Sequence, residues 1–543
     1  MTTQSVDAQK RPDATQHVED PEYPEKSNGV LLKSSNDNLG LWKTVWTFRR
    51  AVIVCNLLCI AAAADGYQIN LNGNIIANDG FTNRLGFLND EGVMTLNANH
   101  TALWGAMQSL GQLLGMILLN PISDRIGRKM TLYVLWVILA GSLIIETLVR
   151  DWRDWAGAKI LAGMGIGAIQ ATLPVYVMEW APVNIRGALI VAYGFWNVIG
   201  KFLANLVLMI VHERNPNDYK TPILTQWAFL GLMLPIFVFL PETPAYYANK
   251  NQDTQGEKTL ARINGKIPGY NVLAEYSIIR NTILLEKQAR EEFGDDRRDT
   301  DIAGILRSYI ECFHRRNVRR TLGACLPGCA QQLAGLSFLN TYASLFFKQS
   351  GFDNAFLITT VLCSIQLATS LALMLLSDKF GRRVMVFGAT ILCTVTLLIV
   401  GILGFITPTQ ALKSFLVFLA CAWSFANTTI GSLGYAFTGE VSSQRLRART
   451  AGVASALSVV FGLVFNTSVP IMLDVNGINW GYKTAWLFFG TGSVVVVLLW
   501  FFLPECSRRN AAEIDEMYEA GVPAWRMGGY VTEIQRGGAG MRV

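Results

Sequence analysis

Long apolar stretches alternate with short charged segments along most of the chain. Nine stretches contain no Asp, Glu, Lys or Arg and approach or exceed the roughly 20 residues that a helix needs to cross a bilayer. They are residues 101–122, 160–178, 221–241, 321–347, 354–377, 384–412, 414–439, 450–473 and 484–504. Three more stretches, 51–76, 130–149 and 187–211, each contain one charged residue. The pattern predicts an all-α membrane protein with twelve transmembrane helices.

Three charged motifs between these stretches occur twice, in the same order. The pairs are SDRIGRK (123–129) with SDKFGRR (377–383), MEWAPVNIRG (178–187) with GEVSSQRLRA (439–448), and LPETP (240–244) with LPECS (503–507). A near-constant offset across three markers indicates an internal duplication. Each repeat then contains six spans, and an even number of spans gives both halves the same orientation in the membrane. We therefore expect two six-helix pseudo-symmetric halves, as in the major facilitator fold.

The repeat also divides the chain into segments. We expect a disordered cytoplasmic N-terminal tail (1–50), an N-terminal half (51–241), a cytoplasmic loop with amphipathic helices (242–320), a C-terminal half (321–504) and a cytoplasmic C-terminal tail (505–543). Most of the 46 Lys and Arg fall on the inner side if the N-terminus is cytoplasmic, which is the positive-inside pattern. A multi-pass protein of the plasma membrane with both termini in the cytoplasm is the resulting prediction.

Composition supports the membrane class and excludes others. Hydrophobic residues make up 51% of the chain and charged residues only 16%, below the roughly 25% of soluble domains. The net charge of +6 is explained by topology, so a nucleic-acid partner is not expected. No nucleophile–base set, clustered metal ligands or phosphate loop is visible. We therefore expect no enzyme activity, cofactor or metal.

The motifs resemble those of the sugar-porter branch of the major facilitator superfamily, over about residues 50–520. The repeated charged loops carry the resemblance, together with PVYVMEWAPVNIRG (174–187), QQLAGLSFLNTY (331–342) and LPECSRRNAAEIDEMYE (503–519). Details such as QQLAG are similar to fungal members. The resemblance implies alternating-access transport of a sugar or sugar-like solute, by a protein expected to be a monomer in the lipid bilayer. An exporter of a small organic metabolite and a membrane sugar sensor are the alternatives.

The resemblance also implies a substrate site. Gln331 and Gln332 match the paired glutamines that contact substrate in the family, whereas Ser337 stands where the family usually has Asn, with Asn340 as a candidate substitute. The other positions that align with substrate contacts are Gln366, Tyr435 and Asn466. The alternative role for each amide is a hydrogen bond between helices.

The tenth apolar stretch lacks the prolines that are usual in the family. Ser432 and Gly434 replace them, so we expect glycine to supply the break in this helix.

The coupling site departs from the family pattern. Proton symporters of this branch have a carboxylate where this chain has Gln68, and an Arg where it has Lys159. Asp65, one helical turn before Gln68, is a candidate displaced acid. Lys201 lies deep in its span, where a buried ammonium without a partner is costly. It is a candidate substrate or ion determinant, and the alternative is that it extends to a membrane face. Uniport and proton symport, with protons as a second partner, are equally compatible with these residues.

Charged residues at the predicted inner ends of the helices form a candidate cytoplasmic gate. Acids and bases recur there at matched spacings, and ion pairs among them would hold the halves together while the cavity opens outward. The alternative is that they are simple interfacial charges. The candidates are Asp124, Arg128, Glu179, Arg186, Glu242, Asp378, Arg382, Glu440, Arg447 and Glu505.

Overall fold

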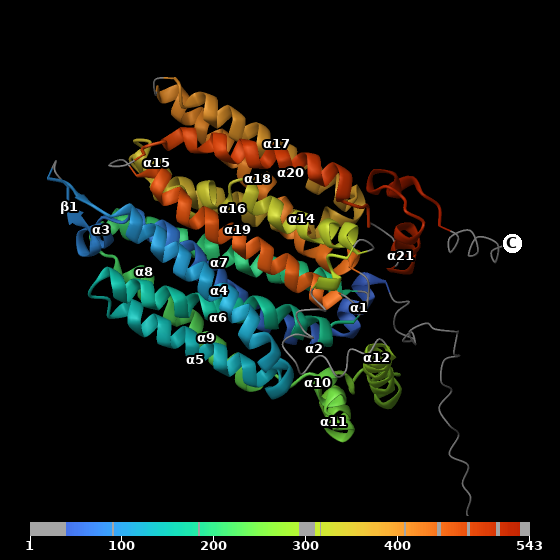
Figure 1. The fold of residues 1–543 in the computed structure, drawn as a ribbon. Coiled ribbons are helices and arrows are strands. Elements are labelled where there is room, and N and C mark those ends of the chain that lie inside the picture. Colours follow the sequence, from blue (N-terminus) through green and yellow to red (C-terminus); the bar gives the residue numbers. More distant parts are fainter. Residues whose placement is uncertain are drawn as a thin grey trace, which may run out of the picture.

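Long helices run side by side along the whole molecule in the computed structural model (Figure 1). The structure describes residues 40–89, 92–182, 185–292, 310–314, 317–406, 409–442, 447–474, 478–506 and 511–532.

The N-terminal half contains six spans. They are α2 (Arg49–Asn74), α4 (Ala98–Ile126), α5 (Arg128–Thr147), α6 (Trp152–Trp180), α7 (Arg186–Arg214) and the pair α8 (Lys220–Leu224) and α9 (Gln226–Phe239). Within this half α4 packs on α6, α2 on α7, and α5 on α6 and α9. Many residues of α2 and α6 are buried because these helices have neighbours on several sides, whereas α5 exposes Val137 and Ile144 on one face.

The C-terminal half repeats this arrangement. Its elements are α14 (Val318–Leu333), a π-helical turn η4 (Ser337–Thr341), α15 (Ala343–Gln349), α16 (Ala355–Phe380), α17 (Arg382–Leu403), α18 (Gln410–Val441), α19 (Arg447–Leu473) and α20 (Thr484–Phe502). Here α17 packs on α18 and α20, and α14 packs on α18, α19 and α20. Between the halves, α16 packs on α7 and α19 packs on α4.

Eleven helices among the described residues are long and apolar enough to cross a membrane. The seventh predicted span, 321–347, is missing from that set because the chain breaks it into α14, η4 and α15. Gly335 lies at the break with φ of +92°, a conformation that residues with a Cβ rarely adopt. In the tenth span our expectation was wrong, because α18 is one continuous helix through Ser432 and Gly434. The break is found in the seventh span instead.

Short elements cover the two ends of the bundle. At the predicted cytoplasmic end lie α1 (Leu41–Thr47), α10 (Pro244–Asn249), α11 (Asp253–Asn264), α12 (Val272–Glu292), α21 (Ala511–Glu519) and η6 (Ala524–Gly529) (Figure 1). At the predicted outer end lie η2 (Ile75–Ala77), α3 (Asp79–Leu85), η5 (Gly481–Lys483) and an antiparallel hairpin of β1 (Phe87–Leu88) and β2 (Met94–Thr95).

The repeated charged motifs build the same turn in both halves. Gly127 and Gly381, with φ of +101° and +81°, separate consecutive spans. In the first half, both carboxylate oxygens of Glu242 accept backbone N–H groups, from Arg128 at 3.1 Å and Lys129 at 3.0 Å. A carboxylate at the first turn satisfies unpaired helix donors and favours the helix dipole. The motifs therefore recur because each half starts its third helix in the same way.

The halves are joined at the predicted outer end. The Asn74 side chain accepts the backbone N–H of Ser344 at 3.1 Å, and Lys348 pairs with Asp79 at 2.7 Å. Beside them, Gly73 packs directly against the backbone of Thr341, where a Cβ would have no room. These contacts close the outer ends of α2 and α15 against each other.

Candidate functional site

A fully buried ion pair lies inside the N-terminal half. Lys159 of α6 contacts Glu146 of α5 at 3.0 Å, and the side chains of both residues have no solvent exposure. Gln68 of α2 donates to the same carboxylate at 2.5 Å, and Gln226 of α9 donates to its other oxygen at 3.1 Å. Ser142 adds a further hydrogen bond at 3.3 Å. Four donors from four helices therefore hold one carboxylate.

The ammonium of this pair is equally well surrounded. Lys159 Nζ lies 4.2 Å from the ring centroid of Trp155, close enough for a cation–π interaction. Charge, ring and amide partners together offset much of the cost of burying two ions.

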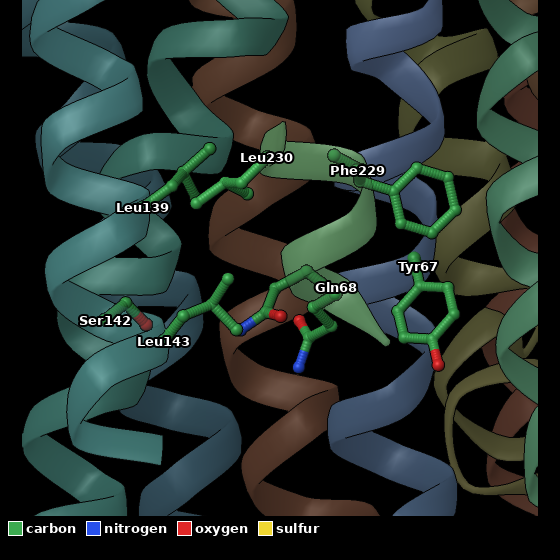
Figure 2. A pocket seen from close by; sticks show the side chains of 9 residues that line it. Tyr67, Gln68, Leu139, Ser142, Leu143, Phe229 and Leu230 are labelled. Atoms are coloured by element: carbon green, nitrogen blue, oxygen red, sulfur yellow. The ribbon is translucent and has the colours of Figure 1, made fainter. Parts of the chain in front are cut away.

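A small cavity adjoins this network between α2, α5 and α9 (Figure 2). Tyr67 and Phe229 lie on one side of it and Leu139 and Leu143 on the other, with Gln68 between them. Its volume of about 10 Å³ leaves room for about one water molecule. A sugar does not fit, so this cavity is not the substrate site.

A second polar cluster surrounds Asp65, one turn before Gln68 on α2. Asp65 is 1% exposed. Its carboxylate accepts hydrogen bonds from Gln170 of α6 at 3.2 Å and from Tyr193 and Asn197 of α7 at 3.3 and 3.1 Å. Three neutral donors therefore hold the carboxylate of Asp65. The carboxylate of Glu146, in contrast, is in contact with a cation.

Lys201 lies on α7, one turn beyond Asn197. It is close enough to Asp65 and to Cys363 of α16 for electrostatic interaction. Within the described part of the chain its ammonium makes no hydrogen bond or ion pair, and the side chain is half-buried. Lys201 thus faces the junction between the halves without a direct partner.

Three amides of the broken seventh span also lack a hydrogen-bond partner among the described residues. Gln331 and Gln332 of α14 and Asn340 of η4 are half-buried, and their side chains make no hydrogen bond to any described residue. Gln331 packs on Gly431 of α18 and Gln332 near Gly462 of α19. These three amides are free to bind a ligand.

Three other predicted substrate residues are engaged within the protein. Gln366 donates to Ser424 at 3.1 Å, between α16 and α18. Asn466 of α19 accepts from Ser337 at 2.7 Å and donates to Ser109 of α4 at 3.1 Å, which links the two halves. These contacts are the helix–helix alternative considered above. The side chain of Tyr435 lies outside the described residues.

The predicted gate charges of the first half contact one another. Arg128 pairs with Asp124 at 2.7 Å and with Glu179 at 3.0 Å. Burial raises the pKa of Glu242, whereas the backbone N–H groups that it accepts act in the opposite direction. Arg186 donates to the carbonyl oxygen of Ala181 at 3.5 Å. All these contacts join elements of one half, whereas the gate hypothesis concerns pairs that join the two halves.

In the second half, Glu505 accepts the backbone N–H of Arg383 at 3.2 Å, which mirrors Glu242. Arg382 is half-buried at the start of α17. The side chains of Asp378, Glu440 and Arg447 lie outside the described residues. The gate role of this group stays a prediction.

Sequence reasoning missed the central member of the ion-pair network. Glu146 is the single charge of the stretch 130–149, and a lone acid in a predicted span is itself a signal for a buried partner. On α7 the signal was the spacing of Tyr193, Asn197 and Lys201 by four residues, which places them on one helix face.

Two pseudo-symmetric helical halves, packed on each other through α7 and α16 and through α4 and α19, define a membrane protein of the major facilitator fold. The chain belongs to the family described as "Sugar (and other) transporter", which matches residues 54–518. It is a multi-pass membrane protein.

Relatives and solved structures agree with this assignment. The chain is 25% identical to the major facilitator-type transporter ecdD of Aspergillus rugulosus, over 90% of both chains. It is 24% identical to the hexose transporter HXT9 of Saccharomyces cerevisiae, over 95% of this chain and 91% of the relative. The fold is similar to that of the proton:xylose symporter XylE bound to 6-bromo-6-deoxy-D-glucose, with a TM-score of 0.67 and 19% identity over 88% of this chain and 100% of that one. An inward-open structure of XylE from E. coli gives a TM-score of 0.66 and 18% identity, over 86% and 99%.

Proposed function

We propose that this protein carries a sugar or sugar-like polyol across the membrane by alternating access, with its two halves rocking about a site between them. The observation that carries the proposal is a set of half-buried amides, Gln331, Gln332 and Asn340, whose side chains make no hydrogen bond to the described residues of this sugar-transporter family member. An amide both donates and accepts, which suits a neutral ligand rich in hydroxyl groups.

Proton symport is the second part of the proposal, with Asp65 as the group that carries the proton. Its carboxylate holds α7 through Tyr193 and Asn197 and holds α6 through Gln170. Protonation removes the negative charge and weakens these three hydrogen bonds. Proton binding is thereby linked to the packing of α7, which contacts the other half through α16.

The remaining parts of the proposal concern the membrane location, oligomeric state, topology and cytoplasmic gate. We assign the protein to the plasma membrane as a monomer with both termini in the cytoplasm, and the gate charges to the ends of the helices on that side. The contacts of Arg128 with Asp124 and Glu179 support a brace that keeps the inner ends of α4, α5 and α6 together as one moving body.

Uptake in cells that lack their own hexose transporters tests the proposal. We expect labelled glucose, maltose or a polyol to accumulate, and a proton uncoupler to abolish the accumulation. Uptake that the uncoupler leaves unchanged would indicate uniport. If no solute enters but an internal metabolite leaves, the protein is an exporter instead.

Gln332→Ala tests the site itself. Losing one or two hydrogen bonds to substrate should raise KM about tenfold, at roughly 1 kcal/mol for each bond. Gln366→Ala is the matched control, because that amide already bonds to Ser424 and its loss should lower stability more than affinity. The two variants are compared by uptake kinetics and by the amount of protein in the membrane. Equal KM for Gln332→Ala and the wild type would remove Gln332 from the site.

A further inference from the structure

One face of α7 carries a line of polar side chains toward the junction of the halves. Tyr193, Asn197, Lys201 and Asn205 follow one another at four-residue spacing, so they lie along one ridge of the helix. The first two donate to Asp65 of α2. Asn205 donates to Cys363 Sγ of α16 at 3.0 Å, across the junction. The ridge therefore lies between α2 of one half and α16 of the other.

Lys201 is the one member of this ridge without a direct partner among the described residues. Asn197 and Asn205, one turn before and one turn after it, each donate one hydrogen bond, to Asp65 and to Cys363. Three neutral donors occupy the carboxylate of Asp65. An ammonium at membrane depth needs water, an anion or a carbonyl oxygen as a partner. The side chain is half-buried, so part of it is open to such a partner.

Proton binding by Asp65 would leave Lys201 as an uncompensated positive charge on the ridge. Electrostatic attraction to Asp65 is lost in that state, because the carboxyl becomes neutral. An anionic group on the solute then restores the balance. The amides Gln332 and Asn340 of the other half remain available for hydroxyl groups.

We propose that the transported solute is a polyhydroxylated monocarboxylate, a sugar acid, whose carboxylate binds the Lys201 ammonium while its hydroxyl groups bind the amides of the seventh span. This inference rests on the proposed function and narrows its substrate class. No bond forms or breaks; binding energy alone selects the acid over the matching neutral polyol.

A comparison of uptake kinetics for two solutes tests this inference on the wild-type protein. Gluconate and sorbitol share a six-carbon polyol chain and differ at one end, where gluconate has a carboxylate and sorbitol a hydroxymethyl group. We expect gluconate to be taken up by the wild type, with a KM at least about tenfold lower than that of sorbitol, because a charge-assisted hydrogen bond is stronger than a neutral one. A lower KM for sorbitol would overturn the inference.

Substitution of Lys201 tests whether this side chain causes the preference for gluconate over sorbitol. Lys201→Gln should lose the tenfold preference for gluconate, and Lys201→Arg should keep it because the charge remains. Lys220→Gln, which removes an exposed positive charge at the start of α8, is the matched control and should behave as the wild type. A gluconate preference that survives Lys201→Gln would overturn the inference, because the carboxylate would then bind elsewhere.

Failure of the inference and failure of the proposed function give different results. If glucose or sorbitol is transported and gluconate is not preferred, the sugar-acid inference is wrong but the protein is still a sugar transporter. If Lys201→Gln does not reach the membrane, the wild-type comparison of gluconate with sorbitol still decides. Absence of uptake of every sugar, polyol and sugar acid by correctly inserted wild-type protein would remove the proposed function itself.

Discussion

The N-terminal half contains two buried acids, each with a lysine nearby, and they are built in opposite ways. Glu146 and Lys159 touch at 3.0 Å, and neither side chain is exposed. Asp65 and Lys201 interact through space without forming an ion pair. Neutral donors satisfy the acid, and the half-buried lysine has no direct partner among the described residues.

We interpret the Glu146–Lys159 pair as structural and propose that Asp65 and Lys201 belong to the working site. Four donors from four helices fix Glu146, so changing its charge would disrupt packing on every side. We expect a change of charge at Asp65 or Lys201 to disturb the fold less, because no ion pair joins these two side chains among the described residues. A transporter needs groups of the second kind where its halves meet, because its two states must differ by only a few kcal/mol. The first kind keeps one half rigid while it moves.

The largest expected effect comes from making the same substitution in both pairs. Lys159→Met should lower the free energy of unfolding by about 3–5 kcal/mol, because it leaves Glu146 buried without its cation. Lys201→Met should leave the melting temperature unchanged or raise it, because it removes a cation that makes no ion pair with any described residue. Thermal unfolding of the purified variants in one detergent measures both.

A double variant controls for the role of charge in the first pair. Glu146→Gln combined with Lys159→Met removes both ions and should recover much of the lost stability. Equal destabilisation by Lys159→Met and Lys201→Met would show that the two pairs are not different in kind.

The sequence predicted the architecture because hydropathy and the repeated motifs report it directly. The apolar stretches become spans, and each repeated turn is explained by a glycine and an acid, such as Gly127 and Glu242. The break was assigned to the wrong helix. The family resemblance led us to expect a glycine break in the tenth span, but α18 is continuous there, whereas the positive φ of Gly335 and the π-helical turn after it break the seventh.

The candidate site could be predicted only in part. Motif alignment identified the amides but could not tell free Gln332 from engaged Gln366, because the Ser424 partner of Gln366 lies on another helix and the sequence does not show which helix faces meet. For the same reason Gln68 was read as the loss of an acid. In the structure a glutamate from α5 stands beside it.

Loss of accumulation in Asp65→Asn is the next expected effect. An amide cannot carry a proton, so uptake by this variant should stop at equilibrium and become insensitive to an uncoupler. Exchange of labelled for unlabelled solute should continue, because the substrate site is unchanged. Uptake and exchange measured side by side in vesicles with an imposed pH gradient distinguish loss of coupling from loss of folding.

Glu146→Gln is the counterpart of that variant in the other pair. It should lower stability but leave gradient-driven accumulation in the surviving protein. The opposite result, with accumulation lost in Glu146→Gln and kept in Asp65→Asn, would move the proton from the junction to the buried ion pair. The assignment of structural and working sites would then be reversed.

The smallest effect is expected at the predicted outer end. There an exposed ion pair joins the two halves, and we expect it to break when the outer end opens. Lys348 and Asp79 join the halves at 2.7 Å, but their side chains are 44% and 45% exposed, so the pair contributes at most about 1 kcal/mol. Asp79→Asn should therefore shift the balance toward the outward-open state by up to about fivefold. The labelling rate of a cysteine introduced at buried Ser344, beside this contact, measures the shift.

Glu213→Gln is the matched control for that measurement, because it removes an exposed acid of α7 at the same predicted end. It should leave labelling of Ser344→Cys unchanged. Faster labelling in Asp79→Asn alone would show that a weak surface pair biases access to the junction, as a two-state carrier requires. Equal rates in both variants would mean that the buried contact of Asn74 with the Ser344 backbone holds the outer end closed without help from the pair.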